Sequence, residues 1–157
     1  MNNKTRFITQ AGLIGAIYVV LTVIFAPISF GEVQVRIAEA LTILPYFTPA
    51  AIPGLFVGCI LGNFIGGAIL YDIIFGSIAS LISAILVYLI RRHKYIVPIP
   101  PIVVNAIAVG LILKYAYAVP LPLISLMMFV AIGQTIACYG LGFPLLILLR
   151  KYNIFRK

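Results

Sequence analysis

Residues 73–90 read IIFGSIASLISAILVYLI and are followed at once by Arg91-Arg92-His93-Lys94. The run contains no charged residue, and its length is close to the roughly 20 residues that a helix needs to cross a hydrocarbon core. A basic cluster directly after an apolar run is typical of a cytoplasmic flank. This stretch therefore predicts a membrane-spanning helix whose cytoplasmic end lies at Arg91.

The composition extends this prediction to the whole chain of 157 residues. Hydrophobic residues make up 64% and charged residues 9%, whereas a soluble domain has about 25% charged residues. We predict an all-α integral membrane protein with a single transmembrane domain over residues 1–157. The apolar runs leave no room for a soluble domain between them.

The basic residues set the number of crossings. Nine of the eleven Lys and Arg residues lie in three flanks, which are residues 4–6, 91–94 and 150–157. If all three flanks are cytoplasmic, the chain crosses once before residue 27, three times between residues 27 and 90, and twice afterwards. This predicts a six-helix bundle with both termini in the cytoplasm. The predicted spans are residues 7–26, 36–47, 50–65, 69–90, 101–117 and 122–149.

The chain has only three acidic residues, Glu32, Glu39 and Asp72. The predicted topology places all three on the external face or just below it, although the acids were not used to derive that topology. Ionisable groups near a membrane interior are costly and usually face a cavity, a partner or a substrate path. The acids therefore predict an external polar pocket.

Arg36 and Glu39 share one face of a helix because they are three residues apart. They either form a salt bridge within that helix or line a cavity in which Arg36 orients Glu39. In a cavity, the carboxylate can accept two parallel N–H bonds from the edge of a planar ligand. Gln34 offers a donor and an acceptor, which suits a lactam or a ring nitrogen.

Other polar residues are further candidates for the pocket. Asp72, next to Tyr71, either stabilises a helix N-terminus or neutralises a ligand amine. Asn63, Asn105 and Gln134 either bind a ligand or form hydrogen bonds between helices.

Small residues recur at helical spacing in two of the predicted spans. The third span contains Gly54, Gly58, Gly62 and Gly66, and the first contains Ala11, Gly12, Gly15 and Ala16. Small residues let helices approach closely in a membrane. We expect the third span to pack inside the bundle. The stripe on the first span fits internal packing and docking on another protein equally well.

Several function classes lack their sequence signatures. The chain has no Walker A loop, no metal-ligand spacing and no nucleophile next to a base, so we expect neither an enzyme nor a cofactor or metal site. The placement of the positive charge in the flanks argues against nucleic-acid binding. A proton-coupled carrier, a small channel and a membrane scaffold remain compatible with the composition.

A family resemblance narrows these possibilities. Residues 33–45, VQVRIAEALTILP, followed by Gly54, Gly58 and Gly62-Asn63, resemble the queuosine-precursor, or QueT-type, members of one transporter class. These are the substrate-binding S components of energy-coupling-factor (ECF) importers, and the resemblance covers essentially the whole chain. It implies a substrate such as 7-aminomethyl-7-deazaguanine or queuine. An S component for another vitamin or purine-like solute is the alternative.

The resemblance also implies partners and a location. The partners are a transmembrane coupling protein, on which the first helix docks, and two cytoplasmic ATPases that use the ATP. The location is a multi-pass position in a bacterial plasma membrane. A deazaguanine presents an N–H/NH₂ edge that suits Glu39, and its aminomethyl cation suits Glu32 or Asp72.

Overall fold

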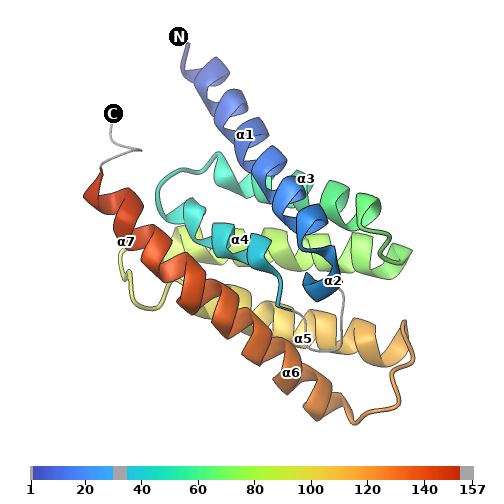
Figure 1. Cartoon of the computed structure of the whole chain (residues 1–157). Helices are drawn as coiled ribbons and strands as arrows, with labels where there is room; N and C mark the ends of the chain where they lie inside the picture. Colours follow the sequence, from blue (N-terminus) through green and yellow to red (C-terminus); the bar gives the residue numbers. More distant parts are fainter. Residues whose placement is uncertain (1, 30–34, 153–157) are drawn as a thin grey trace.

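The computed structural model describes residues 2–29 and 35–152, and every regular element in these ranges is a helix. This confirms the predicted all-α class. Within residues 2–29 and 35–152 the α-helices are α1 to α7 (Figure 1), and the chain there also forms one 3₁₀-helix, η1, and two π-helical segments, η2 and η3. In chain order they are α1 (Asn3–Ile24), α2 (Ala26–Ser29), η1 (Ile37–Tyr46), α3 (Ala51–Ile65), η2 (Asp72–Gly76), α4 (Ser77–Ile90), α5 (Ile99–Tyr115), α6 (Leu123–Thr135), η3 (Ile136–Gly142) and α7 (Phe143–Lys151).

These elements form helical runs that overlap all six predicted spans. Among the described residues, three runs are long and apolar enough to cross a membrane: α1, the continuous η2–α4 run, and the continuous α6–η3–α7 run. The other three, η1, α3 and α5, are apolar but shorter. The largest shift is at the start of the chain, where the helix begins at Asn3 instead of the predicted Phe7.

Hydrogen bonds between distant segments show which ends of the helices lie together. Thr48, after η1, donates to the Gln10 side chain of α1 (Oγ1–Oε1 3.1 Å). The main-chain N–H of Ile69, before η2, donates to the Tyr117 hydroxyl after α5 (3.4 Å). We call the end with residues 3–10, 47–50 and 91–98 the basic end. The opposite end, with residues 25–29, 66–71 and 116–122, is the loop end.

The core of the bundle is built around η1. All residues from Ala38 to Pro45 are buried, and a helix that is apolar on every side is expected in an interior. Apolar side chains of α1, α3, α4 and α7 surround it, among them Ile14, Leu55, Val87 and Leu146. The segment that carries Glu39 is therefore the central element of the fold.

The glycines of α3 allow α1 to approach closely. A Cβ atom on Gly54 would lie 2.6 Å from the carbonyl oxygen of Ala11. One on Gly58 would lie 3.0 Å from the Cα of Gly15. Both distances are too short for a larger residue, so the expected packing of the third span inside the bundle is confirmed. Gly66 lies beyond this contact, as the residue that caps α3.

The small residues of α1 divide between two faces. Gly15 is buried, and Ala11, which contacts Gly54, is half-buried, so this pair faces α3. Gly12 and Ala16 are exposed, and a Cβ atom on Gly12 would meet nothing within 4 Å. Of the predicted docking stripe, Ala11 and Gly15 therefore pack inside the bundle, whereas Gly12 and Ala16 lie on the exposed surface.

Candidate functional site

Six of the predicted site residues are buried within the bundle. They come from the start of η1, from η1 itself and from α3, η2, α5 and α6, so the fold gathers them from distant parts of the sequence. They are Arg36, Glu39, Asn63, Asp72, Asn105 and Gln134. Two further predictions, Glu32 and Gln34, lie outside the described residues.

Glu39 lies at the centre of this group and is fully buried. The Tyr18 hydroxyl of α1 donates to its Oε1 (2.6 Å), and the Asn105 amide of α5 donates to its Oε2 (3.2 Å). A carboxylate accepts from both donors, and hydrogen bonds to an ionised oxygen are short and strong. The site therefore holds a carboxylate with one donor on each oxygen.

A second branch of the site runs from Arg36 to Asp72 through Asn63. The Arg36 guanidinium donates from Nη2 to the Asn63 side-chain oxygen. Asn63 in turn donates from Nδ2 to the main-chain oxygen of Asp72 (3.2 Å). The Asp72 carboxyl group also interacts with the phenol of Tyr117. Arg36 and Asp72, far apart in the sequence, are thus linked through one amide side chain.

A third group connects Glu39 to η3. The Thr42 hydroxyl donates to the main-chain oxygen of Glu39 (2.6 Å), and Cys138 Sγ lies 3.7 Å from that same oxygen. Cys138 Sγ also lies 3.6 Å from the Gln134 Oε1. The site thus contacts both π-helical segments, at Asp72 in η2 and at Cys138 in η3. Such segments occur frequently at functional sites.

Tyr117 borders the site in the loop after α5. Burial raises the pKa of its phenol, and the neighbouring Asp72 carboxylate raises it further. The group is therefore neutral at physiological pH and available as a hydrogen-bond donor.

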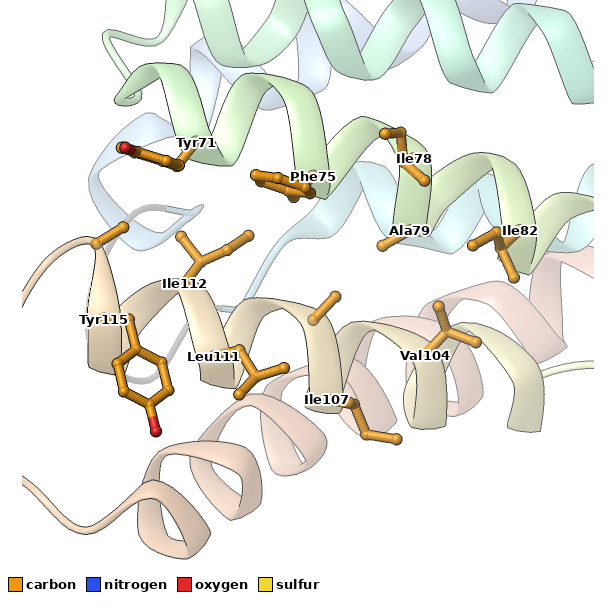
Figure 2. A pocket seen from close by; sticks show the side chains of 12 residues that line it. Tyr71, Phe75, Ile78, Ala79, Ile82, Val104, Ile107, Leu111, Ile112 and Tyr115 are labelled. Carbon is orange, nitrogen blue, oxygen red and sulfur yellow. The ribbon is translucent and has the colours of Figure 1, made fainter.

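Tyr71, also predicted for the site, lies elsewhere. Its side chain is 59% exposed and stacks on Phe75, with ring centroids 6.4 Å apart. The two rings belong to an apolar groove of about 830 Å³ between the η2–α4 run and α5 (Figure 2). The remaining lining comes from Ile, Ala, Leu and Val residues and from Tyr115. The structure does not bring Tyr71 to the polar side chains around Glu39.

Tyr18 and Thr42 also belong to this group of contacts, although they were not predicted from the sequence. Tyr18 is fully buried, and its hydroxyl donates to the Glu39 carboxylate. A signal was present, because Tyr18 follows Gly15 by three residues and so lies on the face of α1 that approaches α3. A polar hydroxyl on a closely packed helix face calls for a buried acceptor.

Comparisons with known proteins agree on one family. A family model described as "QueT transporter" matches residues 8–151. The "Queuosine precursor transporter QueT" of Lactococcus lactis subsp. cremoris (strain MG1363) is 30% identical over 82 residues, which cover 51% of this chain and 48% of that protein. The match thus spans about half the length of this curated relative. No solved structure matches the chain significantly.

Proposed function

This chain belongs to the QueT transporter family, and we propose that it is a membrane-embedded subunit that binds a queuosine precursor outside the cell for import. The substrate is 7-aminomethyl-7-deazaguanine or queuine. The chain performs no catalysis in this proposal. The name of the Lactococcus lactis relative supports the substrate class.

The observation that carries the proposal is the buried carboxylate of Glu39. A carboxylate inside a membrane bundle is costly unless it is well paired. Tyr18 and Asn105 each donate to one oxygen, at 2.6 and 3.2 Å. Each carboxylate oxygen has a second lone pair, so the group is able to accept the parallel N–H and NH₂ of a guanine-like edge. This is the chemistry that a deazaguanine requires.

The proposed topology has six crossings and cytoplasmic termini. Two hydrogen bonds support it. One brings the segment after η1 to the first half of α1, and the other brings the segment before η2 to the segment after α5. The cations at the basic end, Lys4, Arg6, Arg91, Arg92 and Lys94, fit a cytoplasmic face. Glu39 and Asp72 are then reached from the loop end, which faces outward in a bacterial plasma membrane.

Ligand binding is the first test of this function. Purified protein is titrated with 7-aminomethyl-7-deazaguanine and queuine by calorimetry, and a panel of vitamins and purines is screened by thermal shift. The proposal expects saturable binding of a deazaguanine at roughly micromolar Kd or tighter, which corresponds to about 8 kcal/mol. Saturable binding of another solute alone would redirect the substrate assignment. Conduction without any saturable binding would indicate a channel.

We further propose that import requires a transmembrane coupling protein and two cytoplasmic ATPases, which supply the ATP hydrolysis. The exposed face of α1 with Gly12 and Ala16 is the proposed docking surface. Its support is that no described residue of another helix lies within 4 Å of a Cβ on Gly12, since small exposed residues permit close contact with another helix.

Two leucine substitutions separate docking from internal packing. Gly12→Leu adds a side chain to the free surface, so ligand binding is expected to persist while uptake into cells falls to background. Gly15→Leu is the matched control, because a Cβ there would lie 3.0 Å from the Gly54 oxygen. That variant is expected to lose folded protein and binding together. Normal uptake by Gly12→Leu would contradict docking through this face.

A further inference from the structure

Asp72 carries a buried oxygen that no described residue satisfies. Its side chain is 2% exposed, and its Oδ1 has no hydrogen-bond partner among the described residues. An unsatisfied buried acceptor is costly, more so when it is charged. Such an atom in a binding protein points to a donor that the ligand supplies.

The Asp72 Oδ1 packs closely against Gly76. A Cβ atom on Gly76 would lie 2.8 Å from the Asp72 Oδ1 and 3.4 Å from the Asn63 Nδ2. The carboxylate oxygen and the amide thus pack closely against Gly76, and a side chain at this position would crowd the oxygen. The π-helical turn from Asp72 to Gly76 brings the two residues into this contact.

Glu39 differs from Asp72 in its partners. Both oxygens of Glu39 accept a hydrogen bond from a neighbouring helix, from Tyr18 and from Asn105. Asp72 Oδ1 has no such donor within the described part of the chain. Of the two buried acids, Asp72 is therefore the one with a carboxylate oxygen that accepts no hydrogen bond from the described residues.

The balance of charge points to a cation. Among the described residues, the buried charged side chains are Arg36, Glu39 and Asp72. With both acids ionised, this group carries a net charge of −1, since one cation faces two carboxylates. A net charge in a membrane bundle is unfavourable, and a ligand with one positive charge would remove it.

We propose that Asp72 Oδ1 accepts a hydrogen bond from the protonated amine of the substrate and selects 7-aminomethyl-deazaguanines over neutral deazaguanines. This rests on the proposed function, in which Glu39 holds the ring edge. Asp72 is then a specificity determinant, and Glu39 provides affinity for the ring shared by both kinds of base.

The test compares two bases that differ only in the amine. Full-length protein is titrated with 7-aminomethyl-7-deazaguanine and with 7-methyl-7-deazaguanine, and the ratio of the two Kd values is the readout. Wild type is expected to prefer the aminomethyl base by on the order of 10- to 100-fold, the range of a hydrogen bond to a charged group. Asp72→Asn is expected to reduce this preference at least about tenfold.

Three further variants keep the result interpretable. Glu39→Gln is expected to lower the affinity for both bases and to retain the preference for the aminomethyl base. Ser83→Ala is the control for substitutions in the continuous η2–α4 helix. Ser83 is buried and its hydroxyl has no partner among the described residues, so both affinities should be unchanged. Gly76→Ala keeps the charge of Asp72 but crowds its Oδ1, so a reduced preference is expected there too.

The outcomes separate the two proposals. If wild type binds neither base, and does not bind queuine in the calorimetry described above, the proposed function itself is wrong. If wild type binds both bases equally, or if Asp72→Asn binds and keeps the full preference, the role of Asp72 is overturned while the function stands. If Asp72→Asn binds neither base, the Gly76→Ala variant decides the outcome. A reduced preference of Gly76→Ala for the aminomethyl base supports the role of Asp72, and an unchanged preference overturns it.

Discussion

The polar cluster around Glu39 and the apolar groove between α4 and α5 are two very different candidates for a binding site. The groove has the volume, about 830 Å³, and is lined by apolar and aromatic side chains such as Phe75 and Ile107. The cluster has the recognition chemistry, with Arg36, Glu39 and Asp72 all buried and tied to neighbouring helices. Open volume and specific hydrogen bonding thus occur in different places.

The difference shows which property identifies the site in a membrane protein. The lining of the groove includes exposed residues such as Ile78, Ile82 and Leu111. An apolar surface inside a bilayer is satisfied by lipid tails. A polar base in that groove would lose its hydrogen bonds to water without replacement. The cluster offers those replacements, and for this reason it is the proposed ligand-binding site.

Of the substitutions that distinguish the cluster from the groove, removal of the Glu39 charge is expected to change ligand affinity the most. Glu39→Gln replaces the acceptor of two N–H groups by an amide of nearly equal size, and hydrogen bonds to charged groups contribute about 1.5–3 kcal/mol each. Calorimetry should show a loss of affinity for 7-aminomethyl-7-deazaguanine of about 100-fold or more. Indistinguishable Kd values for the variant and wild type would remove Glu39 from the site.

Loss of the Tyr18 hydroxyl is expected to have an intermediate effect. Tyr18→Phe leaves the ring in its packed position but deprives Glu39 Oε1 of its 2.6 Å donor. The expected result is a destabilisation of about 1–3 kcal/mol, seen as a lower melting temperature, with affinity reduced about fivefold. The matched control is Tyr139→Phe, whose hydroxyl donates to the Tyr95 oxygen outside the cluster. Equal affinities for Tyr18→Phe and this control would show that the Tyr18 bond does not orient Glu39.

Filling the groove is expected to have the smallest effect. Ala108→Phe places a large ring in the groove, whose lining includes Ala108, and a phenyl ring on this apolar surface exchanges with lipid. Affinity for the base should change less than about twofold, which is within the usual range for surface substitutions of 0.5 kcal/mol. A loss as large as that of Glu39→Gln would shift the binding site from the cluster to the groove.

The helical architecture was predictable because apolar run length and basic flanks are local features of the sequence. Arg91-Arg92-His93-Lys94 marks the end of α4, and the spacing of Gly54 and Gly58 predicts the close approach that the structure shows. The 3₁₀ form of η1 and the π-helical turns were not predicted. They depend on packing against neighbouring helices and leave no local pattern.

The site was predictable as a set of residue types but not as a set of contacts. Acids and amides are rare in such an apolar chain, and placing them in a membrane interior costs free energy. Glu39, Asp72 and Asn105 could therefore be identified from their residue types alone. Their partners come from other helices, and no spacing rule connects Tyr18 to Glu39. Tyr71 was predicted for the site from its place next to Asp72 in the sequence. Consecutive residues of a helix do not share a face, and the structure places the Tyr71 ring in the groove.

The position of the bound base is best tested by an experimental structure of the protein with 7-aminomethyl-7-deazaguanine. We expect the N–H/NH₂ edge of the base within about 2.7–3.0 Å of the Glu39 carboxylate oxygens, inside the bundle. A base lying instead against Tyr71 and Phe75, in the groove between α4 and α5, would contradict this expectation.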